Sequence, residues 1–441
     1  MSIIEVVAIA IALAVLMTLM LKGANVYLSA AVALFTLCLI GSIPVWDGIN
    51  SYMDGFVNYL KRFFPIFMST AIFGKLMAVT RASNSVALLM IRVFGEKYVV
   101  LAVGAACALL TFCGVSVFIS IFALVPIAVE IFQRIDIPHR FMPATLLYGG
   151  FAIGHTAPGS PMNSNVIPVT LLKGMGADVT LMAGAVIGWA VCAVMFAANY
   201  WIMLRLITAA KANGEHFTRH PDDPAKTVDE SALPPPALAL IPLLSVIFFV
   251  NAPLIGGKPM WTPNGVACGS GLLFILLFKY FDFKKIKDQM SDAFRDTILM
   301  TTGISAVVGF ASVVKLVPAF GAMIEGILAI PGPPLISAAI VMTLVAGITG
   351  SGSGALGIVV PILGPEMLAK GVDPSAFSRV MTMSSCGFDS LPHNGAVAGV
   401  TLACNEKTGS CYMPMFWVTV VVPTLGSFVA AVLFSMFPGL P

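Results

Sequence analysis

The sequence predicts an all-α integral membrane protein whose two halves are inverted-topology repeats. Hydrophobic residues make up 58% of the chain and charged residues only 10%, a composition outside the range of soluble domains. Several apolar runs approach or exceed the roughly 20 residues that a helix needs to cross a bilayer. These runs cover residues 3–21, 26–43, 181–206, 237–250 and 416–437. They are apolar on every face, whereas the strands of a membrane barrel would alternate apolar and polar residues.

One long polar segment, residues 211–236, divides the chain. We interpret it as an exposed linker between a first repeat, residues 1–210, and a second repeat, residues 237–441. The lysine cluster at residues 284–287 is expected in the cytoplasm by the positive-inside rule, and two crossings back place the linker there as well. The N-terminus is then outside, and the helices that open each half run in opposite directions, as in an inverted repeat.

A direct comparison of the halves supports this division. The pattern P-x-N-x-x-V-x-x-V-T-L begins at Pro161 and again at Pro392, so Asn163 and Asn394 hold equivalent positions. Upstream of it, Ser116 corresponds to Ser351. An ordered series of matches indicates an internal repeat.

Each half also contains a glycine-rich interruption of an apolar run, at residues 111–116 and 347–354. Irregular backbone at membrane depth has to line a cavity or pack against protein, and the N-termini of half-helices there attract anions. The expected substrate contacts at these interruptions are Gly114, Ser116, Thr349, Gly350, Ser351 and Ser353. The competing interpretation is close helix packing by small residues.

A second, polar interruption follows in each half, at residues 155–165 and 389–395. Asn163 and Asn394 either bind substrate or satisfy freed backbone groups there. Asp389, His393 and His155 are ionisable groups inside expected membrane segments, which makes them candidates for proton coupling. For each histidine, a purely structural hydrogen-bonding role is the alternative.

Other features exclude several function classes. The chain lacks the G-x-x-x-x-G-K-[ST], H-E-x-x-H and G-x-S-x-G patterns, so neither an ATP-driven pump nor an intramembrane hydrolase is expected. Eight cysteines without paired spacing indicate packing, with no cofactor or metal, and a net charge of +3 does not indicate nucleic-acid binding. The stretches 56–75 and 283–315 are amphipathic and belong either to the membrane interface or to a scaffold. The remaining classes are a secondary transporter of a small organic anion and a passive anion channel.

These motifs together resemble the gluconate permease (GntP) family of the ion-transporter superfamily. The resemblance is clearest at residues 114–118, 137–143, 158–168, 350–354 and 391–395. It implies proton-coupled symport of gluconate or another hydroxy-carboxylate across the bacterial inner membrane, with protons favoured over sodium. It also implies a homodimer in which re-entrant hairpins move by an elevator-like mechanism against a scaffold. Residues 114–121 lack the acidic residue of sugar-acid members, which keeps 3-hydroxybutyrate or lactate as an alternative substrate.

Overall fold

The computed structural model describes residues 3–22, 24–223, 230–253, 259–320, 332–392 and 394–440, and every regular element among them is helical. In the first half the elements are α1 (Ile3–Leu21), α2 (Val26–Ile40), α3 (Val45–Val79), α4 (Ala82–Phe94), η1 (Glu96–Tyr98), α5 (Val99–Phe112), α6 (Val117–Arg134), η2 (His139–Phe141), α7 (Met142–Gly149), η3 (Gly150–Gly154), α8 (Asn163–Gly174) and α9 (Ala185–Ala212). The short η4 (Glu230–Ala232) lies in the linker. The second half contains α10 (Pro236–Asn251), α11 (Thr262–Leu276), η5 (Phe278–Tyr280), α12 (Phe283–Val314), α14 (Pro334–Thr349), α15 (Gly352–Ala369), α16 (Pro374–Ser384), η6 (Phe388–Ser390), α17 (Gly395–Ala403), α18 (Thr408–Met415), η7 (Phe416–Val421) and α19 (Val422–Met436).

Six of the described helical stretches are long and apolar enough to cross a membrane, by length and composition. They are Val45–Val79, Val117–Arg134, Ala185–Ala212, Phe283–Val314, Gly352–Ala369 and Thr408–Met436. Shorter apolar helices, such as α2, α10 and α11, accompany them. The predicted apolar runs therefore form helices, with ends that differ from the expected ones by a few residues.

The two amphipathic stretches belong to the longest helices, α3 and α12, which pack along each other. Gly55 and Gly309 lie at their contact, where an added Cβ would collide with Ser312 and with the backbone of Tyr52. Ser51 Oγ also donates a 3.0 Å hydrogen bond to the carbonyl oxygen of Ser312. Small residues thus allow a close backbone approach. This pairing favours the scaffold interpretation of both stretches.

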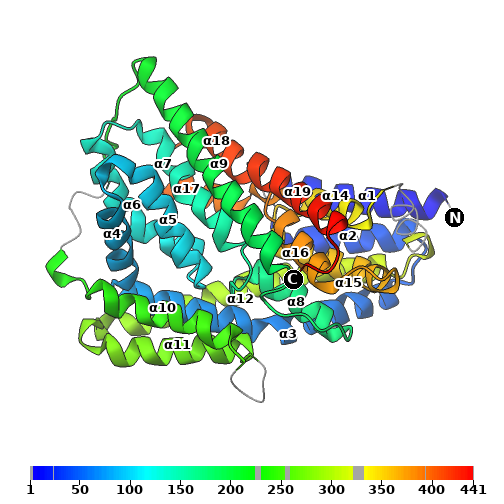
Figure 1. The fold of residues 1–441 in the computed structure, drawn as a ribbon. Helices are drawn as coiled ribbons and strands as arrows, with labels where there is room; N and C mark the ends of the chain where they lie inside the picture. The colour runs from blue at the N-terminus through cyan, green and yellow to red at the C-terminus, as the bar shows by residue number, and fades with distance from the viewer. Residues whose placement is uncertain are drawn as a thin grey trace.

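Two helical hairpins flank this long pair. The hairpin of α1 and α2 lies at the N-terminal end of the molecule, and that of α10 and α11 lies at the opposite end (Figure 1). α2 packs on α12, the long helix of the other half, and α11 packs on α3 in the same crossed manner. The first three helices of each half therefore make corresponding contacts. We call these six helices the scaffold layer.

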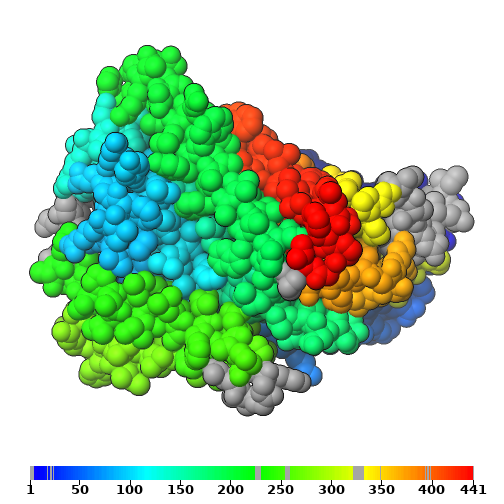
Figure 2. All heavy atoms as spheres, viewed as in Figure 1, coloured from blue at the N-terminus to red at the C-terminus, as the bar shows by residue number. Residues whose placement is uncertain are grey.

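The remaining helices form a second layer, which we call the core. Within it, α5 and α6 contact each other, as do α14 and α15. α15 crosses to pack on α8 of the first half, and α17 packs on α6. α9 and α19 lie side by side on one face of the molecule (Figure 2). The core thus interleaves segments from both halves of the sequence.

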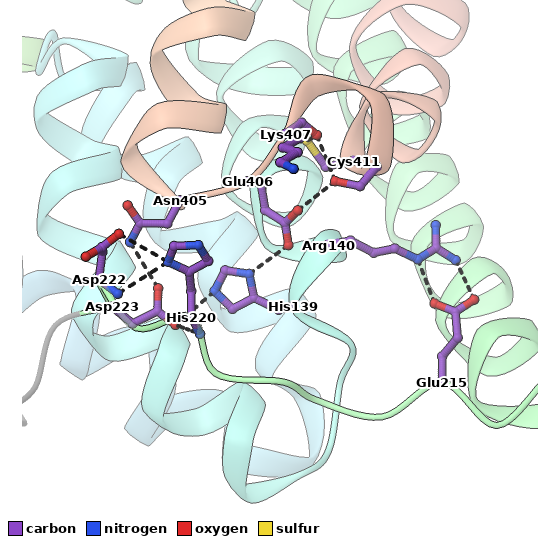
Figure 3. Close-up of polar contacts among 11 residues, drawn as sticks. His139, Arg140, Glu215, His220, Asp222, Asp223, Asn405, Glu406, Lys407 and Cys411 are labelled. Carbon is purple, nitrogen blue, oxygen red and sulfur yellow. Dashed lines mark hydrogen bonds and ion pairs between the residues drawn. The ribbon is translucent and has the colours of Figure 1, made fainter.

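The linker, expected to be exposed, is in part held against the core, and the expectation is wrong for Asp223, which is buried. Arg140 donates two hydrogen bonds to Glu215, of 2.7 and 2.8 Å. The buried His139 lies between Glu406, at 2.8 Å, and Asp223, at 3.3 Å (Figure 3). Glu215 and Asp223 thus attach the first part of the linker to η2. His139 also connects this contact to Glu406, in the turn before α18.

Candidate functional site

The glycine-rich interruption of the first half is a short break between α5 and α6. Gly114 has a φ of +93°, a left-handed conformation that glycine adopts without the steric cost of a Cβ. An added Cβ at Gly114 would lie 3.0 Å from the ring of Pro161, so this break touches the polar interruption of the same half. Ser116 precedes α6 and is half-buried, and its hydroxyl makes no capping hydrogen bond. That hydroxyl is available to a ligand.

The equivalent break of the second half lies between α14 and α15. Gly350 turns the chain with a φ of +58°. Ser351 caps α15 by accepting a 3.1 Å hydrogen bond from the Gly354 N–H, and Thr349 Oγ1 donates to the carbonyl oxygens of Val345 and Ser351, at 2.9 and 3.2 Å. These two hydroxyls stabilise the turn itself. The half-buried Ser353 hydroxyl makes no such bond within the described residues.

The two equivalent asparagines differ in their surroundings. Asn394 donates a 2.6 Å hydrogen bond from Nδ2 to the carbonyl oxygen of Gly350, which joins the two interruptions of the second half. Asn163 begins α8 and is half-buried, and its side chain makes no hydrogen bond to a described residue. Asn394 therefore satisfies a freed carbonyl group, the role that competes with substrate binding. Asn163 is the better placed of the two for a ligand.

Asp389 lies at the N-terminus of α15. Ser390 Oγ donates a 3.0 Å hydrogen bond to its carboxylate, and the backbone N–H of Gly352 also faces it. A helix N-terminus favours negative charge, so the protein's own carboxylate occupies part of the position expected for a substrate anion. Proton binding at Asp389 would therefore change the charge at the helix end directly.

The structure describes one of the two histidines that are candidates for proton coupling. His155 packs its ring edge-on against Phe151, with ring centroids 5.3 Å apart. Its backbone carbonyl oxygen accepts hydrogen bonds from Ser164 and Asn165, at 2.5 and 3.1 Å. The ring itself makes no hydrogen bond to a described residue. His393 lies outside the described residues.

Arg379, on α16, connects the two halves and was not predicted from the sequence. It is fully buried and donates to the carbonyl oxygens of Ala183, Thr156 and Leu181, at 2.9, 2.8 and 3.0 Å. It also donates a 2.5 Å hydrogen bond to Oδ1 of Asn165. The available signal was a lone arginine among the uncharged residues between Asp373 and Asp389, because charges are rare inside membrane segments.

A second contact between the halves lies one helical turn further along α16. Thr382 Oγ1 donates a 3.0 Å hydrogen bond to the carbonyl oxygen of Ser164, in the polar interruption of the first half. Within each half the two interruptions also touch, at Gly114 with Pro161 and at Gly350 with Asn394. All four interruptions therefore belong to one connected region of the core.

Among the described residues, the buried hydroxyls of Ser384 and Thr424, beside the second polar interruption, have no hydrogen-bond partner. Thr424 adjoins Gly387, where an added Cβ would collide with it. Buried polar groups are normally paired, so these hydroxyls are further candidates for ligand contact. Two open hollows, of about 390 and 290 Å³, lie elsewhere: between α3 and α12, and among α4, α6 and the linker.

The sequence profile of GntP family permeases matches residues 1–256, more than half of the 441-residue chain. This chain belongs to the GntP permease family. It is also 29% identical over 474 residues to an uncharacterized transporter, YxjC, of Bacillus subtilis (strain 168), covering 98% of this chain and 99% of the relative. The predicted family is thus confirmed.

The fold of this GntP permease is similar to the crystal structure of the Alcanivorax borkumensis YdaH transporter, described as having an unusual topology. The TM-score is 0.62 at 17% sequence identity, covering 89% of this chain and 90% of the other. At this identity the likeness concerns the fold alone. The permease is a multi-pass membrane transport protein for a small solute, with bacterial relatives, rather than an enzyme.

Proposed function

We propose that this permease is a proton-coupled symporter of a small hydroxy-carboxylate such as gluconate, in the bacterial inner membrane. The observation that carries the proposal is that α16, which leads into the second polar interruption, binds the first one through Arg379 and Thr382, while Asn394 joins the two interruptions of the second half. Discontinuous helices that meet near the bilayer midplane are typical substrate sites of secondary transporters. The substrate carboxylate would bind at Ser116, Asn163 and Ser353, with Gly114 and Gly350 forming the tips.

The proposed architecture consists of two inverted repeats, residues 1–210 and 237–441, joined by a cytoplasmic linker, residues 211–236. The corresponding contacts of the scaffold helices support it, since α2 and α11 each pack on the long helix of the other half. In this proposal the core moves in an elevator-like manner against the scaffold layer, and the protein is a homodimer with its N-terminus outside.

Asp389 is the proposed proton carrier, with His155 and His393 as further candidates. Its carboxylate faces the N-terminus of α15, next to the proposed anion site. Protonation removes the charge that competes with a bound carboxylate for the same helix end. Substrate and proton would therefore bind together.

A shorter acid, 3-hydroxybutyrate or lactate, is the second candidate substrate. Residues 114–121, at the first break, carry no acidic side chain that could accept hydrogen bonds from several sugar hydroxyls. The substituents of the substrate would then meet mostly apolar surface. This choice changes the substrate and leaves the coupling mechanism unaltered.

Uptake of labelled gluconate, 3-hydroxybutyrate and lactate into proteoliposomes, with and without an inward proton gradient, tests the proposal. We expect saturable uptake of one of them that accelerates with the gradient, and loss of this acceleration in Asp389→Asn. The exposed Asp178→Asn is the matched control and should behave as wild type. Equal rates with and without the gradient would refute proton coupling, and non-saturable flux would indicate a passive channel.

A further inference from the structure

Arg379 is the only buried lysine or arginine among the residues that the structure describes. Its four hydrogen bonds go to three backbone carbonyl oxygens and one amide oxygen, all of them neutral groups. It takes part in none of the ion pairs of the described residues. The core thus carries a positive charge with no carboxylate in direct contact.

Such a charge is costly. A charged group inside a membrane segment is unfavourable by several kcal/mol unless another charge balances it. Arginine stays protonated, so this cost is not relieved by loss of a proton. If hydrogen bonds to carbonyl groups were the whole role of residue 379, a neutral amide donor could make some of them without the cost. The geometry therefore points to a use for the charge itself.

We pair this charge with that of Asp389, which follows Arg379 along the chain, after the end of α16. Arg379 lies on α16, and Asp389 follows on η6, where its carboxylate lies beside Gly352. The groups that face Asp389 are the Ser390 hydroxyl, the Gly352 N–H and the Cys386 thiol, all neutral. His155 packs against Phe151 at a separate position and is counted as neutral. His393 lies outside the described residues.

We infer that Arg379 is the fixed positive charge that sets the charge of the transported substrate to a single negative unit. This inference rests on the proposed symport and deepens it. In the empty core, the positive charge of Arg379 and the negative charge of ionised Asp389 give a net charge of zero. In the loaded core, Asp389 has taken up one proton and is neutral, and the charge of Arg379 cancels that of one bound carboxylate, so the net charge is again zero. The core then crosses the bilayer uncharged in both directions, which avoids the cost of moving a charge through hydrocarbon.

Two consequences follow. A dicarboxylate such as malate would leave the loaded core with one unbalanced negative charge and the tricarboxylate citrate with two, so the permease should discriminate against both in favour of monocarboxylates. Each crossing step also moves no net charge, so the transport rate should not respond to membrane potential. A purely structural role is separated by substitution, because Arg379→Lys and Arg379→Gln both disturb the carbonyl contacts but only Arg379→Gln removes the charge.

The first experiment uses the wild-type protein in proteoliposomes, with the substrate found in the uptake assay and the potential clamped by potassium and valinomycin. We expect a rate that changes less than about twofold between 0 and −100 mV, a potential worth about 2.3 kcal/mol for each charge moved. Malate and citrate should compete at least about tenfold more weakly than lactate or gluconate. A strongly voltage-dependent rate, or equal competition by dicarboxylates, would overturn the inference. Absence of proton-stimulated uptake would instead refute the proposed function.

The second experiment compares variants. In Asp389→Asn the empty core is positive and the loaded core neutral, so labelled-substrate exchange should persist while net uptake is lost. Adding Arg379→Gln makes the loaded core negative and should abolish that exchange, whereas adding Arg379→Lys should keep it. Exposed Arg205→Gln is the control for a lost positive charge. A folded double variant, monodisperse with a wild-type melting temperature, that still exchanges substrate would overturn the inference. If the glutamine variant fails to fold, the wild-type voltage test decides.

Discussion

The side-chain amide of Asn394 donates a 2.6 Å hydrogen bond to the carbonyl oxygen of Gly350, 44 residues away in the chain. This bond joins the glycine turn before α15 to the polar interruption before α17. It also means that the turn at Gly350 does not hold its shape alone. Whatever binds at this turn must either keep the Asn394 contact or replace it.

Asn394→Ala should weaken substrate binding about fivefold to tenfold, because a lost hydrogen bond of about 1 kcal/mol frees the Gly350 turn. The measurement is the half-saturating substrate concentration for uptake, together with the ligand-induced rise in melting temperature. Asn213→Ala, at the exposed end of α9, is the matched control. An unchanged thermal shift in Asn394→Ala would contradict the assignment.

Gly350→Ala should lower both stability and transport. Gly350 has a φ of +58°, where a Cβ costs about 1–2 kcal/mol. Gly371→Ala is a close control, since Gly371 has a φ of +73° and open space around it. Both variants should melt at a similarly reduced temperature, and only Gly350→Ala should lose uptake. Equal uptake by the two variants would show that the Gly350 turn has no role beyond folding.

Gly104→Ala should destabilise the protein by about 1–3 kcal/mol, the usual range for overpacking. Gly104 faces the ring of Tyr148, whose hydroxyl donates a 2.8 Å hydrogen bond to the Val100 carbonyl oxygen, and an added Cβ would collide with that ring. Gly271→Ala, on α11, meets no atom within 4 Å. It should be neutral or stabilising by up to about 1 kcal/mol through helix propensity. Melting temperatures in detergent measure both, and equal losses would contradict the close contact of α5 and α7.

The attachment of the linker to the core should weaken only in acid. Hydrogen bonds from Arg140 lower the pKa of Glu215. A lowered pKa means that the ion pair contributes fully above the ordinary glutamate pKa of about 4.3 and is lost as the pH falls from there through the lowered value. Hydrogen exchange of residues 213–223, compared at each pH between wild type and Glu215→Gln, measures this. The variant should exchange faster at pH 7, and the difference should shrink in acid and vanish only below the lowered pKa of Glu215.

A persistent difference between the two proteins at low pH would show that Glu215 acts through something other than its charge. The neighbouring Asp136 provides a second check. The backbone N–H of Phe217 and the ring of His216 lower the pKa of its carboxyl. Asp136→Asn should therefore show the same pH pattern in the same peptide.

Local sequence patterns predicted much of the architecture. Glycine adopts left-handed backbone conformations without steric cost, so the breaks at Gly114 and Gly350 could be located from the sequence, although the glycines and prolines of α15 do not interrupt that helix. The equivalent sequence positions of Asn163 and Asn394 did not predict equivalent contacts, because the two residues have different neighbours in the fold. The prediction that the linker is exposed was wrong at Asp223, because a polar sequence does not show which residues it will contact in the fold.

The sequence by itself determined that the protein lies in a membrane, which segments are helices, where these helices are interrupted, and the family. Hydrophobicity, backbone freedom and motif spacing are properties of short segments. Only the tertiary structure decided the contacts of Arg379. Its hydrogen-bond partners lie between 196 and 223 residues away and include backbone carbonyl groups, which have no signature in the sequence. Helix packing across the two halves brings them together, and that packing depends on the whole chain at once.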